Sequence, residues 1–244
     1  MTLARQFTLA LAALASCWTT TPATPARPAP PEQGPEGRRS INLGEVPAEG
    51  NSVRDFVPPG WVVEDQAGGD LDRDSKPDIV LKLVEGQPHS ADGVTNERGR
   101  ALIVLLTTGG GRLRRAAASG RLLYCVGCAG VLEDPAGSNV SVKIENGVIV
   151  LEQMRGSREA VTSTLRFRHD PRAGRFLLIG EEVENRDRFT GRNVHESSNY
   201  LTGVKIVRIS QYDKRSDREV AVSVRKGRVA SSKRFLEDVD GESY

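Results

Sequence analysis

The sequence has little of what enzymes most often use for catalysis. It contains three histidines and three cysteines in 244 residues, and no histidine has a serine, cysteine or metal-ligand partner at a recognisable spacing. It also lacks a Gly-x-Ser-x-Gly nucleophile motif, a phosphate-binding glycine loop and a metalloprotease histidine pair. These absences argue against an enzyme.

An excess of charge of one sign is also missing, since 34 lysines and arginines face 32 aspartates and glutamates. Basic residues are interspersed with acidic ones, and small clusters such as 112–115 and 214–215 are typical of the solvated face of a β-strand. We therefore predict no nucleic-acid partner.

Long hydrophobic runs are absent except for residues 7–15, which follow the cationic Arg5. This run is too short to anchor a folded protein across a bilayer, and small residues close it. Residues 1–17 are therefore predicted to be an export signal peptide.

The end of this signal, Leu14-Ala15-Ser16-Cys17, resembles the lipobox of bacterial lipoproteins. The resemblance implies that the Cys17 thiol is acylated, and that the protein is exported and lipid-anchored to a bacterial membrane in the cell envelope. The alternative is ordinary cleavage after Ala15, which would leave a periplasmic or secreted protein.

Residues 18–55 are rich in proline, threonine, alanine and glycine. Proline removes backbone donors, and the segment has too little apolar side chain to offset the entropy of ordering. It is predicted to be a disordered linker, which leaves residues 56–244 as a single folded domain.

In this domain short apolar runs alternate with turn residues, and helical periodicity is scarce. Strands are predicted at 61–65, 79–84, 101–107, 113–118, 140–145, 148–153, 163–169, 175–183, 204–210 and 219–224. Turns are expected at Asn146-Gly147, at 170–174 and at Lys226-Gly227. The pattern predicts an all-β fold: an antiparallel meander of hairpins with blade-like sheets packed together, or else a two-sheet β-sandwich.

Cys125 and Cys128 lie in a glycine-rich segment. Outside the cytoplasm a disulfide persists, so the pair is predicted to be a disulfide staple at a turn. Zinc would need two further ligands, which the sequence does not supply at ligand spacing. A thiol-redox site is the alternative, although Gly127 and Gly130 favour a loop over the helix start that such a site needs.

An aspartate-rich loop carries the motif with the clearest chemistry. Asp70, Asp72, Asp74 and Asp78 occupy positions 1, 3, 5 and 9, the pattern by which alternating carboxylates surround a calcium ion. The backbone carbonyl of Lys76, at position 7, would complete the ring. These five residues are the predicted ligands of a structural Ca²⁺ ion.

The loop departs from the usual calcium pattern at two positions. Leu81 replaces the glutamate at position 12, so the loop is not an EF-hand. Ser75 stands at position 6, where glycine normally permits the sharp turn, and a non-glycine residue there is expected to weaken calcium binding.

The aspartate loop with the apolar strand after it, followed by the run 100–106, looks like an FG-GAP or VCBS-type repeat of the integrin-α propeller kind. In that family such a loop binds calcium between blade strands. More widely, the order of motifs from Phe56 to Asp238 is similar to a group of uncharacterised bacterial lipoproteins and secreted proteins. This resemblance implies calcium and β structure, and no established activity.

Together these features favour an exported cell-envelope protein with a non-catalytic binding or scaffold role toward an unknown protein or polysaccharide partner. One alternative is an envelope hydrolase in which Glu152 meets Glu181 or Glu182 in three dimensions. The other is a redox protein that uses Cys125 and Cys128.

Overall fold

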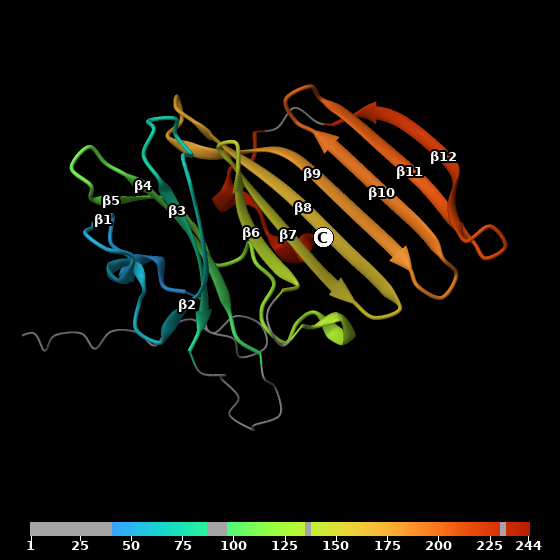
Figure 1. The fold of residues 1–244 in the computed structure, drawn as a ribbon, viewed down its shortest axis with the longest axis horizontal. Coiled ribbons are helices and arrows are strands. Elements are labelled where there is room, and N and C mark those ends of the chain that lie inside the picture. Colours follow the sequence, from blue (N-terminus) through green and yellow to red (C-terminus); the bar gives the residue numbers. More distant parts are fainter. Residues whose placement is uncertain (1–40, 87–96, 135–137, 230–232) are drawn as a thin grey trace, which may run out of the picture. The chain divides into compact units, whose positions relative to one another are not determined.

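The computed structural model describes residues 41–86, 97–134, 138–229 and 233–244. The predicted signal peptide, with Cys17, and residues 18–40 of the predicted linker lie outside the described residues. The described chain forms two antiparallel sheets (Figure 1).

The five-stranded sheet has the spatial order β1 (Glu49–Gly50), β5 (Leu113–Ser119), β4 (Arg100–Thr107), β3 (Asp78–Glu85) and β2 (Trp61–Gly69). The seven-stranded sheet has the order β12 (Arg218–Arg228), β11 (Val204–Asp213), β10 (Arg192–Asn199), β9 (Arg175–Asp187), β8 (Glu159–Asp170), β7 (Val148–Gly156) and β6 (Val140–Glu145). Short 3-10 helices are η1 (Leu43–Glu45), η2 (Val53–Phe56), η3 (Gly130–Leu132), η4 (Leu236–Asp238) and η5 (Gly241–Ser243). Apart from β1, strands that are neighbours in a sheet are neighbours in sequence, so the predicted all-β antiparallel meander is confirmed.

A buried cluster joins the two sheets. Val80 and Val104 of the five-stranded sheet belong to the same cluster as Ile149 and Phe167 of the seven-stranded sheet. The opposite face of the five-stranded sheet carries a second cluster that includes Phe56, Trp61, Leu81, Leu83, Ile103 and Leu105. Because β3 and β4 are buried on both faces, their sequences are nearly continuous apolar runs.

The folded region begins earlier than the sequence predicts. Residues 41–55, predicted as part of the disordered linker, are folded against the five-stranded sheet: Ile41 is 6% exposed and Val46 is 2% exposed. In addition, Gly50 of β1 pairs with Leu113 of β5. The composition of the segment did not predict that it is folded, because a few well-spaced apolar side chains suffice to cover the second face of a sheet.

The strand β10 was not predicted, because its sequence is polar and does not alternate. Residues 193–199 pair with β9 and residues 192–199 pair with β11, so backbone hydrogen bonds hold the strand in the sheet. The turn expected at Lys226-Gly227 is wrong, since both residues lie inside β12 and pair with β11. The turn at Asn146-Gly147 is confirmed, with φ values of 52° and 76°.

Candidate metal centre

The aspartate loop connects β2 to β3, with Asp70 directly after β2 and Asp78 as the first residue of β3. Two loop residues take up left-handed backbone conformations, Arg73 with φ 67° and Ser75 with φ 68°. Ser75 therefore makes the turn that glycine usually makes, at a conformational cost of about 1–2 kcal/mol. The turn directs two backbone N–H groups at one carboxylate, since Asp70 Oδ1 accepts from Arg73 N at 2.7 Å and Asp70 Oδ2 accepts from Ser75 N at 3.0 Å.

Three carboxylates converge in this loop. One oxygen from each of Asp70, Asp72 and Asp78 lies within 4.8 Å of the others. Oxygens that share a calcium ion each lie about 2.3–2.6 Å from it, so a mutual separation of this size fits one common ion. The structure therefore brings together three of the four aspartates that the sequence singled out.

Asp78 is the buried member of the group, with 0% exposure. Its Oδ2 accepts from Leu71 N and its Oδ1 from Thr107 N, both at 2.8 Å. Burial raises the pKa of the Asp78 carboxyl, the hydrogen bonds from Thr107 and Leu71 oppose this, and the nearby Asp72 carboxylate raises it further. A cation at this position would relieve both the desolvation and the repulsion.

Asp74 and Lys76 have different surroundings from the converging group. Asp74 Oδ1 accepts from Lys76 N at 2.9 Å, and Asp74 Oδ2 pairs with the Lys76 ammonium. The hydrogen bond from the Lys76 side chain lowers the pKa of Asp74, and the same bond raises the pKa of Lys76. The sequence predicted only the backbone carbonyl of Lys76 as a calcium ligand. In the structure the ammonium group of Lys76 also lies in the acidic loop, paired with Asp74.

Two groups that support the site could not be predicted from the sequence. Thr107, at the end of β4, donates its backbone N–H to Asp78, and its Oγ1 donates to the carbonyl of Pro77 at 2.6 Å. Gly147, in the turn between β6 and β7, approaches so closely that an added Cβ would lie 3.2 Å from the carbonyl oxygen of Asp70. Both residues reach the loop through sheet packing, which spacing in the sequence does not reveal.

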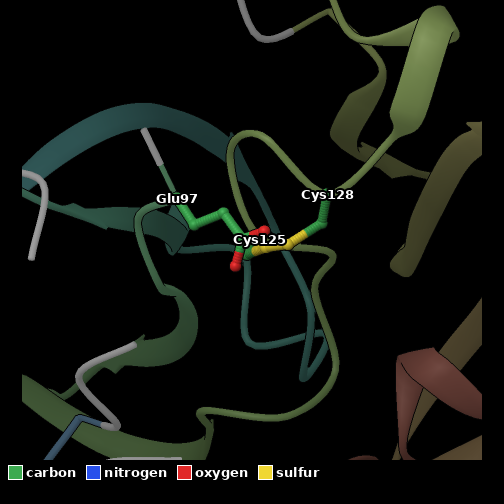
Figure 2. A group of neighbouring side chains, drawn as sticks. All are labelled: Glu97, Cys125 and Cys128. Carbon is green, nitrogen blue, oxygen red and sulfur yellow. A yellow bond between two sulfur atoms is a disulfide. The ribbon is translucent and has the colours of Figure 1, made fainter. Parts of the chain in front are cut away.

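The predicted disulfide is present: Cys125 and Cys128 are bonded, with their Cα atoms 5.3 Å apart, and the Glu97 carboxylate lies beside them (Figure 2). Backbone hydrogen bonds between Val126 and Arg98, in both directions, hold the segment in place. Bonded sulfurs are not thiolate ligands, so this group offers no metal site in the disulfide form. Only the three-residue η3 follows the pair, in place of the helix that a thioredoxin-like site needs.

The glutamates of the hydrolase alternative have other partners. Glu181 Oε2 accepts from Arg234 and from the Tyr244 hydroxyl, both at 2.7 Å. Glu182 lies on the opposite side of β9, because neighbouring residues of a strand face opposite ways, and it pairs with Arg166 at 3.3 Å. Glu152 and Glu182 both stand opposite Thr164 of β8, so they lie on one face of the sheet, two strands apart.

Comparisons with known proteins return no relative: no known protein family, no curated protein and no solved structure matches the chain. None of the helices in the described residues is long and apolar enough to span a membrane. The aspartate loop is therefore the feature whose chemistry bears most directly on function.

Proposed function

We propose that this chain is an exported cell-envelope protein, lipid-anchored through Cys17, whose β domain is braced by a calcium ion and serves as a binding or scaffold module. The observation that carries the proposal is the convergence of Asp70, Asp72 and Asp78 on one point, with Asp78 buried. Three carboxylates crowded in this way repel one another, and oxygen ligands on a curled loop suit calcium.

The position of the loop explains what the ion would do. Asp70 follows β2 directly and Asp78 begins β3, while Thr107 of β4 and Gly147 of the β6–β7 turn contact these two aspartates. An ion bound here would tie three strands of one sheet to a hairpin of the other. Since it binds the folded state alone, it would add about 2.7 kcal/mol of stability at a free concentration one hundred times its dissociation constant.

Thermal unfolding of the mature protein, with calcium and with a chelator, tests the proposal. We expect calcium to raise the melting temperature of the parent, and Asp72→Asn to lose most of that increase. Asp74→Asn is the matched control, because Asp74 lies outside the converging group and should retain more of the calcium response. A parent protein whose melting temperature ignores calcium would refute the proposed site.

The lipid anchor is tested separately, by mass spectrometry of the mature N-terminus from membranes. Acylated Cys17 is the expected first residue, and Cys17→Ser should leave the protein in the soluble fraction. An unmodified N-terminus at another residue would contradict the anchor while leaving the calcium proposal untouched.

A further inference from the structure

A cavity of about 510 Å³ lies beside the aspartate loop, against the turn between β8 and β9. Its charged and titratable lining residues are Asp72, Arg73, Arg168, His169, Asp170, Arg172 and Lys233. The cavity lining thus contains four residues with a positive charge, three arginines and one lysine, and two aspartates. The acidic loop and this basic cavity share Asp72 and the adjacent Arg73.

One of the two carboxylates is already engaged. Asp170 Oδ1 accepts from Arg172 N at 3.0 Å, and Asp170 Oδ2 lies 3.7 Å from the Lys233 ammonium. The bond from the Arg172 N–H lowers the pKa of Asp170, which therefore stays ionised and offsets Lys233. The charge of Arg172 also acts on Asp170, so the cavity keeps a net positive charge of four cations against two carboxylates.

The guanidinium groups of Arg73, Arg168 and Arg172 have no hydrogen bond or ion pair with any part of the chain that the structure describes. Other arginines do have carboxylate partners, as Arg100 has Glu64 at 2.7 Å. These three line one cavity, whereas the exposed Arg225 of β12 lies outside it. Guanidinium groups that line one cavity and have no hydrogen-bonded carboxylate partner suit the recognition of an external oxyanion.

We propose that this cavity binds the phosphoryl group of a phosphate ester. A phosphoryl group carries up to two negative charges and three terminal oxygens, so several guanidinium groups can share it, whereas a carboxylate offers two oxygens and one charge. The cavity is in the range of small-molecule sites and has apolar walls at Leu71, Pro171 and Leu177, which suit the organic part of an ester. The ring of His169, 5.3 Å from that of Phe176, is packed in place as a further wall.

The inference goes beyond calcium binding and does not depend on it. If the loop does bind calcium, the ion neutralises Asp72, the second carboxylate of the cavity, and the affinity for the anion increases. By linkage, the anion then increases the affinity for calcium by the same factor.

The test is calorimetric titration of the full chain with phenyl phosphate in the presence of a chelator, so that a failure of the calcium site does not affect the result. We expect saturable binding at one site. Arg168→Ala and, separately, Arg172→Ala should weaken it by about tenfold, the effect of removing one charge-assisted hydrogen bond. Arg225→Ala, with the same change of charge on β12, should bind like the parent. Arg172 lies in an exposed turn, so its variant is expected to fold even if the Arg168 variant does not.

Absence of saturable binding, or an equal loss in the Arg172 and Arg225 variants, would overturn the proposal. Benzoate is the carboxylate control, and an affinity equal to that of phenyl phosphate would also overturn the phosphoryl assignment. Binding to vesicles of phosphatidic acid, compared with vesicles of phosphatidylcholine, shows whether the phosphoryl group belongs to a lipid headgroup or to a soluble ester. Binding that is selective for phosphatidic acid and depends on Arg172 supports a lipid headgroup as the ligand. Binding of phenyl phosphate without vesicle binding supports a soluble ester.

Discussion

The Arg100 guanidinium holds the Glu64 carboxylate by two hydrogen bonds of 2.7 Å, from Nε and from one terminal nitrogen, although β3 separates their strands. The other terminal nitrogen of Arg100 donates to the carbonyl of Tyr124 at 3.1 Å. On β3 itself, Lys82 donates to the carbonyl of Val140 in the seven-stranded sheet at 2.7 Å. This buried network therefore links three strands of one sheet to each other and to the second sheet.

Replacing Glu64 with Gln should destabilise the protein by about 3 kcal/mol, because it leaves the fully buried Arg100 charge without its counter-ion. Denaturant unfolding measures the difference. Glu196→Gln is the control, since the Glu196 pair with Lys205 is solvent-exposed and such pairs contribute about 0–1 kcal/mol. Equal losses in the two variants would show that the buried network does not stabilise the fold.

The stability of the protein should depend on pH through Lys82. Burial is the main cause that lowers the pKa of Lys82 below its usual 10.5, and the Glu64 carboxylate partly opposes it. Between the lowered pKa and 10.5 the unfolded chain binds more protons at this residue than the folded chain, so stability contributed by Lys82 rises with pH there. Relative to Lys82→Met, the parent should therefore gain free energy of unfolding as the pH approaches 10.5. A pH-independent difference between the two proteins would contradict this account.

Ser75→Gly should stabilise the protein by about 1 kcal/mol in a chelator, because glycine adopts the positive φ of 68° without the steric penalty that serine carries. Ser75→Val, with a β-branched side chain, should instead lose at least roughly 1 kcal/mol. Urea unfolding of the parent and the two variants gives their order of stability. A valine variant as stable as the glycine variant would be inconsistent with the loop geometry.

Gly241→Ala should loosen the C-terminal segment that contains η4 and η5. An added Cβ at Gly241 would lie 2.2 Å from the carbonyl oxygen of Leu122, so the backbone must move, at a cost of about 1–3 kcal/mol. Limited proteolysis should cut this segment faster than in the parent. Gly227→Ala is the matched control, because a Cβ there meets no atom within 4 Å, and faster cutting in both variants would rule out a local effect.

Much of the fold follows from local patterns in the sequence. The apolar runs of β3 and β4 identify buried strands, and Asn146-Gly147 identifies a hairpin, because backbone preferences and side-chain burial act over a few neighbouring residues. The spacing of Cys125 and Cys128 was enough to predict their disulfide. The aspartate spacing likewise predicted a loop that gathers carboxylates.

Only the tertiary structure decided which groups meet. It joined Asp78 to Thr107, which lies 29 residues away on another strand. It also brought Arg73 of the loop to the same cavity as Arg168 and Arg172 of the β8–β9 hairpin. Such contacts depend on strand register and on the packing of two sheets, and these are set by the sum of many weak interactions along the chain that no short pattern encodes.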